Sequence, residues 1–199
     1  MLRVYRIPFS TNVERVALAL GHKGMAVEWV DVDPADRTPI REVSGQQLVP
    51  VIEDGDLVLT DSTRILHHLE ELQPEPPLFP GDPARAAEVE IFLDWFNRAW
   101  KREPNLIADE AGDAEATVRW GDRMQRRLEL FERLLHGRDY LFGEFGAADC
   151  AAWPFLRYAV QIEPDDDEAF HRVLYERLDV SGHPQLSEWI KRVAQRPKG

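Results

Sequence analysis

Short strand-like runs and a helical run alternate at the start of the chain. Residues 2–7 form a short strand-like run that stops at a proline. Apolar residues then recur at i, i+3, i+4 and i+7 from Val13 to Leu20, which predicts a helix that ends at Gly24. A β-branched run at 27–33 predicts the second strand.

The next part of the chain predicts a hairpin and a second helix. Residues 34–48 are rich in turn formers, and we expect them to be irregular or to hold one helical turn. Two apolar runs on either side of an Asp-Gly dipeptide predict a hairpin at 50–60, and Asp61-Ser62 begins a helix. The order β-α-β-(irregular)-β-β-α is typical of a thioredoxin-like layer.

Beyond this region the pattern becomes helical. The stretch QPEPPLFPGD holds four prolines and one glycine, which is typical of a linker. The helices expected after it are 84–109, 115–136, 147–161, 167–179 and 184–196. The predicted fold class is therefore α/β plus all-α: a thioredoxin-like domain at 1–76, a linker at 77–83 and an all-helical bundle domain at 84–199.

Composition excludes several classes of function. The chain has 24 Lys and Arg against 36 Asp and Glu, a formal net charge of −12, so we expect no nucleic-acid or membrane partner. Its single cysteine, Cys150, excludes an intrachain disulfide and a CxxC dithiol site, and it fits a reducing compartment. The start of the chain lacks the apolar run of a signal peptide, so we expect a cytoplasmic protein. The six histidines show no metal-ligand spacing, and we expect no metal site.

Ser10 is the first residue that could carry chemistry. It stands before the first helix, where unpaired backbone N–H groups and the positive end of the helix dipole lie. A hydroxyl there can donate a hydrogen bond to a thiolate and lower the pKa of the thiol, or it can be a plain turn or cap residue. Thr11 and Glu14 match a capping box, so we expect Thr11 to cap the helix and leave Ser10 free. Thr11 and Asn12 remain alternatives to Ser10.

Two more features follow in the same half. A cis proline at Val49-Pro50 could expose the preceding backbone to an extended peptide, and an ordinary strand-entry proline is the alternative. Asp61 and Ser62 begin a helix, where backbone N–H groups and a hydroxyl can bind a carboxylate. The same residue types are also the commonest N-caps, so both interpretations remain open.

The chain resembles the glutathione S-transferase family over nearly its whole length. The N-terminal half has three of the family's features in the family's order, namely Ser10, Val49-Pro50 and Asp61-Ser62. The stretch LFGEFGAADCAAWP at 141–154 resembles the family's "G…S-x-A-D…P" segment, with Gly146 where the family prefers Ser or Thr and with Asp149 in its structural place. The segment 183–197 resembles the family's last helix.

This resemblance implies roles for the candidate residues. Ser10 is the implied catalytic residue, which stabilises the glutathione thiolate. The implied glutathione-binding residues are Ser10, Leu48, Val49, Pro50, Asp61 and Ser62. The implied acceptor pocket comprises Phe9, Asn12, Trp95, Trp100 and Trp153, and core packing is the alternative for the tryptophans. Leu48 stands where many members have Lys or Gln, and Asp61 replaces the commoner Glu.

The implied function is that of a serine-type glutathione S-transferase, closest in its N-terminal pattern to the tau and zeta groups. Glutathione is the co-substrate, and its enzyme-activated thiolate attacks a hydrophobic electrophile, as in detoxification. A zeta-type isomerase is a related alternative, although Ser10-Thr11-Asn12 replaces that group's Ser-Ser-Cys signature.

Two alternatives come from other classes. One is a transferase-like binding or interaction module without turnover. The other, a glutaredoxin-type oxidoreductase, is disfavoured because Ser10 stands where a reactive Cys would be. Because the family is largely dimeric, the resemblance also implies a homodimer, with exposed apolar residues near 60–100 at its contact.

Overall fold

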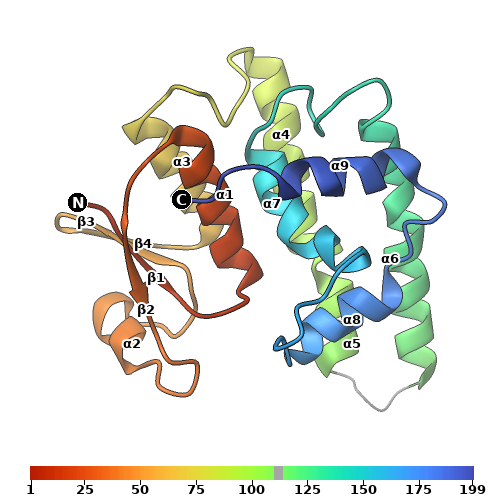
Figure 1. Ribbon diagram of the computed structural model, residues 1–199, viewed down its shortest axis with the longest axis horizontal. Helices are drawn as coiled ribbons and strands as arrows, with labels where there is room; N and C mark the ends of the chain where they lie inside the picture. Colours follow the sequence, from red (N-terminus) through yellow and green to blue (C-terminus); the bar gives the residue numbers. More distant parts are fainter. Residues whose placement is uncertain (110–113) are drawn as a thin grey trace. The chain divides into compact units, whose positions relative to one another are not determined.

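The computed structural model describes residues 1–109 and 114–199. These residues form two compact units, one comprising Met1–Pro80 with Arg196–Gly199 and the other Gly81–Gln195. The first unit holds a small mixed sheet with helices, and the second is helical (Figure 1). The predicted fold class is thereby confirmed.

A four-stranded sheet with the order β2-β1-β3-β4 organises the first unit. β1 (Arg3–Arg6) pairs in parallel with β2 (Glu28–Asp31) and antiparallel with β3 (Val51–Asp54). β3 pairs antiparallel with β4 (Leu57–Thr60) across the predicted hairpin. Gly55 adopts φ 59° in the two-residue turn, a conformation that glycine tolerates without a steric penalty.

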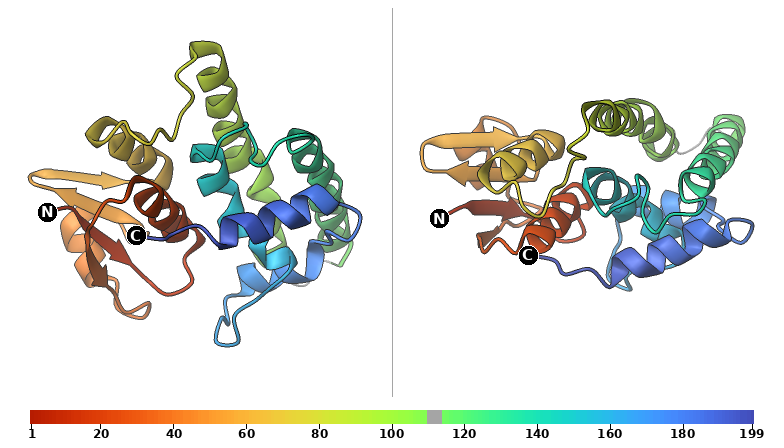
Figure 2. Two further views of the ribbon diagram at one scale, coloured as in Figure 1. Left: turned by 45° about the horizontal axis from the view of Figure 1, so that its top comes forward. Right: turned by 90° about the horizontal axis from the view of Figure 1, so that it is seen from above.

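Three helices complete this unit: α1 (Thr11–Lys23), α2 (Thr38–Ser44) and α3 (Ser62–Leu72). α1 and α3 pack against each other and lie side by side in every view (Figures 1 and 2). α2 lies within the segment expected to be irregular. α2 is a seven-residue helix with a proline in its first turn, and Gly45 in the left-handed conformation ends it. Both are common residues at helix boundaries.

The second unit consists of helices and short helical turns. Its elements are α4 (Pro83–Trp95), a π turn (Phe96–Trp100), α5 (Arg102–Asp109), α6 (Ala114–Leu134), α7 (Ala147–Leu156), a 3₁₀ turn (Arg157–Ala159), α8 (Ala169–Arg177) and α9 (Pro184–Ala194).

The single helix predicted at 84–109 is interrupted. A π turn follows α4, and a new helix begins at Arg102. Pro104 explains the break, because it has no N–H to donate to the carbonyl of Trp100 four residues earlier. Pro104 instead occupies the first turn of α5, where this N–H is not needed.

α7 is the centre of the helical unit. All ten of its residues are buried, and it contacts α4, α8 and α9. Cys150 on this helix is fully buried, as is common for cysteine. Pro154 lies inside α7 without ending it.

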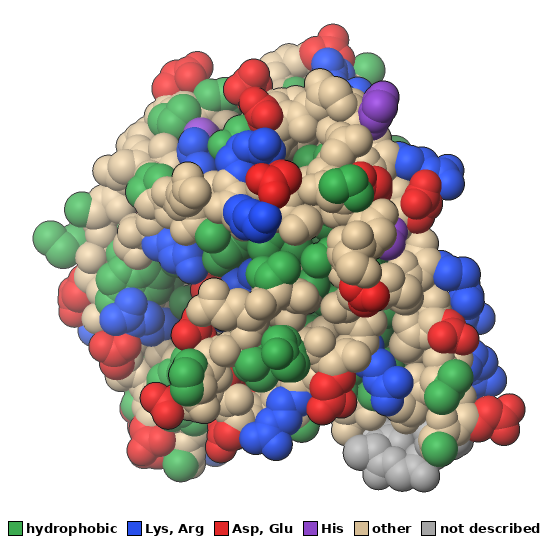
Figure 3. Space-filling view, turned by 45° about the vertical axis from the view of Figure 1, so that its right-hand side comes forward, with side chains coloured by type: hydrophobic (Ala, Val, Ile, Leu, Met, Phe, Trp, Pro, Cys, Tyr) green, Lys and Arg blue, Asp and Glu red, His purple; other side chains and the backbone are tan. Residues whose placement is uncertain are grey.

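Charged side chains of both signs lie on the face shown in Figure 3. Acidic and basic groups are mixed there, and no large area of one sign is visible. This face therefore indicates no partner of a single charge.

Candidate functional site

One edge of the sheet brings the predicted residues together. Tyr5, Val51 and Thr60 lie in one row across β1, β3 and β4. Since β3 runs antiparallel to both neighbours, the end of β1, the start of β3 and the end of β4 share this edge. Ser10 follows β1 and Ser62 follows β4, so both hydroxyls are positioned at the same edge.

The cis peptide lies between them. The Val49-Pro50 bond is cis and directly precedes β3. Val49 is buried and shares a hydrophobic cluster with Val13 of α1 and with Tyr5 and Val51 of the sheet. This cluster joins the first turn of α1 to the segment before β3.

Ser10, and not Thr11, caps α1. The Ser10 hydroxyl oxygen accepts a hydrogen bond from the backbone N–H of Val13 at 3.4 Å, while Thr11 is the first helical residue and is buried. The expectation that Thr11 holds the cap is therefore wrong by one residue. Because a hydroxyl can accept and donate at the same time, this cap leaves the Ser10 O–H able to donate.

Strained backbone precedes each of the two serines. Within the described residues, Phe9 (φ 58°) and Asp61 (φ 73°) are the non-glycine residues with positive φ. Such conformations cost on the order of 1–3 kcal/mol and are enriched at functional sites. Their positions, each directly before a candidate serine, support a functional role for both serines.

Ser62 has a buried cationic neighbour. The Arg15 guanidinium donates to the Ser62 hydroxyl at 3.3 Å, and both residues are buried. Ser62 is also the first residue of α3, where backbone N–H groups and the helix dipole favour an anion. A guanidinium, a hydroxyl and a helix N-terminus together form a cradle suited to a carboxylate.

Arg15 was missed by sequence reasoning. The available signal was an arginine inside the apolar run VERVALAL, where a charge needs a specific partner.

Asp61 acts as the cap of α3. Its carboxylate accepts hydrogen bonds from the backbone N–H groups of Thr63 at 2.8 Å and Arg64 at 3.2 Å. These bonds orient the start of the helix that presents Ser62. The binding of a ligand ammonium by Asp61 remains a prediction.

Leu48 extends into solvent beside the cis peptide, with 71% of its surface exposed. The nearby Gln46 side chain donates its amide N–H to the Leu48 carbonyl at 2.8 Å, and its amide oxygen accepts from the Leu48 N–H. The Gln46 amide is therefore engaged with the main chain of Leu48.

Comparison with known proteins decides the family. The model "Glutathione S-transferase, N-terminal domain" matches residues 4–77, and "Glutathione S-transferase, C-terminal domain" matches residues 82–192. This chain belongs to the glutathione S-transferase superfamily.

Among the individual relatives, some are named for a transferase activity and one for a cellular localisation. FtsZ-localized protein A of Caulobacter vibrioides is 30% identical over 173 residues, which cover 75% of this chain and 73% of that protein. Glutathione S-transferase Z1 of Arabidopsis thaliana is 36% identical over 86 residues, covering 41% of this chain and 38% of that protein. A solved glutathione S-transferase from Rhodospirillum rubrum F11 has a TM-score of 0.79 and 27% identity, and the match covers 99% of this chain and 89% of that one.

Two residues of the predicted acceptor pocket are core residues of the helical unit. Trp100 is fully buried and stacks on Phe96 with ring centroids 4.7 Å apart. Trp153 is buried, and its indole N–H donates to the Ile190 carbonyl at 2.8 Å. For both tryptophans the packing supports the core alternative. Trp95, like Phe9 and Asn12 of the first unit, is only partly buried.

Neither a metal cluster nor a spanning segment occurs in the described part of the chain. Among residues 1–109 and 114–199, no three His, Cys, Asp or Glu side chains are grouped to hold a metal ion. No helix in these ranges combines the length and apolarity required to cross a membrane.

Proposed function

We propose that this glutathione S-transferase family member binds glutathione at the sheet edge and conjugates its thiolate to a hydrophobic electrophile. The observation that carries the proposal is the pair of serines at one sheet edge, Ser10 at the N-cap of α1 and Ser62 beside Arg15 at the start of α3. The adjacent cis peptide at Val49-Pro50 is the third part of the same edge.

In this proposal the γ-glutamyl end of glutathione binds at Ser62. Its carboxylate accepts hydrogen bonds from the Ser62 hydroxyl and from Arg15, which already lie 3.3 Å apart. The main chain at Val49, with Leu48 and Pro50 beside it, holds the cysteinyl part. Asp61 contributes the cap that fixes the first turn of α3.

Ser10 then acts on the thiol. A free thiol has a pKa of about 8.5, so only a few per cent of it is ionised at neutral pH. Lowering that pKa by about two units corresponds to about 2.7 kcal/mol, which a donated hydrogen bond and the N-terminus of α1 supply together. The thiol proton leaves to solvent. The sulfur electron pair forms a C–S bond with the electrophilic carbon, and the leaving group departs with its bonding pair.

Glutathione titration tests the binding part of the proposal. Ser62→Ala removes one charge-assisted hydrogen bond, so the Kd measured by isothermal titration calorimetry should rise about 10- to 100-fold. Ser187→Ala in α9 is the control, because Ser187 belongs to the helical unit and not to the proposed glutathione site. Equal Kd values for Ser62→Ala and wild type would place the site elsewhere. A chloronitrobenzene assay then tests turnover.

A binding or interaction module without turnover is the second candidate. It is favoured by the similarity to FtsZ-localized protein A, a relative that is named for a localisation and not for a reaction. Absence of any heat of glutathione binding in the wild-type protein would favour this candidate. The isomerase alternative is favoured by the match to Glutathione S-transferase Z1, and an isomerase assay on a maleyl ketoacid separates it from conjugation.

Three further expectations remain proposals: the homodimer, the cytoplasmic location and the domain boundaries at 1–76, 77–83 and 84–199. A contribution of Phe9, Asn12 and Trp95 to electrophile binding is also part of the proposal.

A further inference from the structure

Two segments at the borders of the first unit bind to the end of the same helix. The exit segment comprises residues 73–79, just before the chain leaves the first unit at Pro80. The return segment comprises Arg196–Gly199, where the chain enters that unit again. Both contact α1 at its last turn, at the neighbouring residues Lys23 and His22. The exit segment is held by the Lys23 ammonium, whereas the return segment contacts the His22 imidazole.

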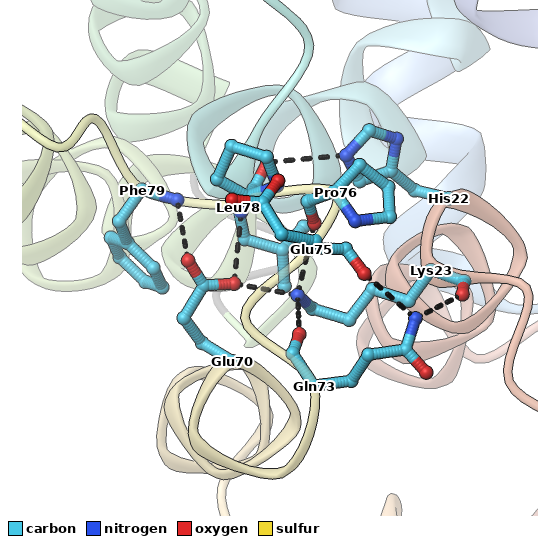
Figure 4. A network of polar contacts seen from close by, with 9 residues as sticks. His22, Lys23, Glu70, Gln73, Glu75, Pro76, Leu78 and Phe79 are labelled. Carbon is cyan, nitrogen blue, oxygen red and sulfur yellow. Dashed lines mark hydrogen bonds and ion pairs between the residues drawn. The ribbon is translucent and has the colours of Figure 1, made fainter.

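Lys23 holds the exit segment. Its side chain is fully buried, and its ammonium donates to the Glu70 carboxylate at 2.6 Å and to the carbonyls of Gln73 and Pro76 (Figure 4). The Glu70 carboxylate also accepts from the backbone N–H of Leu78 at 2.9 Å. The exit segment is therefore attached to α1 through several contacts of one buried ammonium, and none of these contacts involves His22.

The return segment lies along α1 and contacts it at several points. The Gly199 N–H donates to the Ala17 carbonyl at 2.9 Å, and the Lys198 ammonium donates to Glu14 at 2.9 Å. Gly21 lies directly beneath this segment: a Cβ atom at Gly21 would stand 2.1 Å from the Pro197 carbonyl oxygen. The close approach therefore requires a glycine at position 21.

His22 contacts both segments at once. Its Nε2 lies 3.1 Å from the Pro77 carbonyl oxygen, and its Nδ1 lies 2.6 Å from a guanidinium nitrogen of Arg196. A carbonyl can only accept and a guanidinium can only donate. The imidazole must therefore be neutral, with its proton on Nε2 and its Nδ1 lone pair facing Arg196.

We propose that His22 is a pH-sensitive latch and that its protonation releases the return segment from α1 while the exit segment stays attached. A proton on Nδ1 removes the acceptor for Arg196 and places two positive groups 2.6 Å apart. The Nε2–H bond to Pro77 survives protonation, because both forms of the ring donate from Nε2.

The surrounding charges set the direction of the pH effect. Burial lowers the pKa of His22; the Pro77 carbonyl opposes this, Arg196 and Lys23 lower the pKa further, and Glu70 raises it. Of the other charged side chains on these elements, Glu75 of the exit segment is exposed, and Lys198 is paired with Glu14. Because the pKa is lower in the folded state, the contact is fully formed above about pH 6.5 and is lost as the pH falls through the folded-state pKa.

Glycine-selective ¹⁵N NMR on the full chain tests the latch. In wild type, the Gly199 amide signal should move reversibly to a random-coil position as the pH falls from about 7.5 to about 5, with a midpoint below about 6.5. Gly55, in the hairpin of the same unit, should keep its signal and so report an intact fold. An unmoved Gly199 signal over this range overturns the proposal.

Two substitutions of His22 assign the transition. His22→Gln stays neutral and can donate to Pro77 and accept from Arg196, so the Gly199 signal should keep its bound position at every pH. His22→Lys carries a fixed charge, so that signal should be coil-like throughout. A pH transition that persists unchanged in His22→Gln assigns the effect to another group and contradicts the proposal.

Gly21→Ala releases the segment without titration. The new Cβ meets backbone atoms of Pro197 and Lys198, which cannot move aside unless the segment moves. The Gly199 signal should then be coil-like at about pH 7.5, and its pH transition should disappear. Gly121→Ala in α6 is the matched control, because its Cβ meets only the flexible Arg177 side chain at 3.3 Å. A native Gly199 signal in Gly21→Ala refutes the proposed contact.

Discussion

At the scale of single residues, the Ser10 hydroxyl has two roles in the proposed function. Ser10 caps α1 through its oxygen, and in the proposed function its proton is donated to the thiolate. A substitution at Ser10 therefore changes both helix stability and chemistry. A useful experiment must separate the two effects.

Ser10→Gly provides this separation. Glycine is a nearly equivalent N-cap, at a cost of a few tenths of a kcal/mol, whereas alanine costs about 1 kcal/mol. Both variants lack the hydroxyl, so both should slow conjugation about 10-fold or more near pH 6.5 and recover partly at alkaline pH. The pH dependence of kcat/KM, measured beside thermal unfolding, checks this. Wild-type turnover in both variants would assign thiol activation to another group.

Arg15 and Ser62 should act as one unit in binding. Their side chains are in contact and buried, and in the proposed function they share one ligand carboxylate. Arg15→Met and Ser62→Ala should each weaken glutathione binding, and the double variant should lose less than the sum by about 0.5–3 kcal/mol. Calorimetric Kd values for the four proteins of this double-mutant cycle measure the coupling. Strict additivity would mean that the two residues bind independently.

At the scale of elements, Asp149 joins three parts of the helical unit. Within the described residues its carboxylate accepts from the backbone N–H of Leu141 at 3.1 Å, the backbone N–H of Gly146 at 3.0 Å and the indole of Trp189 at 2.7 Å. It thereby fixes the start of α7 although Gly146 has no side chain for a capping box.

Asp149 also makes stability depend on pH. Burial raises its pKa from 3.8 to about 6, although its three N–H donors favour the carboxylate. Between about pH 4 and pH 6, Asp149 is therefore mostly protonated in the folded protein and mostly ionised in the unfolded chain. The Asp149 contribution to the unfolding free energy is largest below about pH 4 and falls by up to about 1.4 kcal/mol per pH unit up to about pH 6.

Asp149→Asn tests this dependence. The amide cannot titrate, and its NH₂ group faces backbone or indole donors, so the variant should be less stable by about 1–3 kcal/mol. Urea unfolding at pH 5, 6 and 7 should show the difference between wild type and variant shrinking as the pH rises. A constant difference over that range would mean that Asp149 does not take up a proton there.

At the scale of the whole molecule, exposed apolar residues lie where the predicted dimer contact was expected. The edge strand β4 exposes Leu57 and Val58, α3 exposes Leu72, and α4 exposes Ile91, which is 70% accessible. An exposed edge strand presents unpaired backbone N–H and C=O groups that can pair with another surface. We therefore keep the homodimer as a prediction.

Sedimentation equilibrium decides the oligomeric state. A homodimer should give twice the chain mass of 22.9 kDa at micromolar concentration, and Ile91→Glu should weaken it about 10-fold or more. Val118→Glu on α6 is the control, since Val118 is also exposed but lies outside the predicted region. A 22.9 kDa species for wild type would refute the dimer.

The sequence alone determined the features that depend on near neighbours. The helical spacing from Val13 to Leu20, the stop at Gly24 and the hairpin around Gly55 all appear in the structure, because each rests on interactions within a few residues. The ordered set of Ser10, Val49-Pro50 and Asp61-Ser62, together with the segments 141–154 and 183–197, pointed to the family. The full seven-residue length of α2 and the break before α5 were not predicted, although their signals, Gly45 and Pro104, are also local.

Only the tertiary structure decided which residues meet across the chain. Arg15 found its partner at Ser62, and the return segment docked on α1 at Gly21. Each contact depends on how distant segments align in the folded state. Local propensity carries no information on such an alignment, because the partners come close only after sheet pairing and core packing have formed.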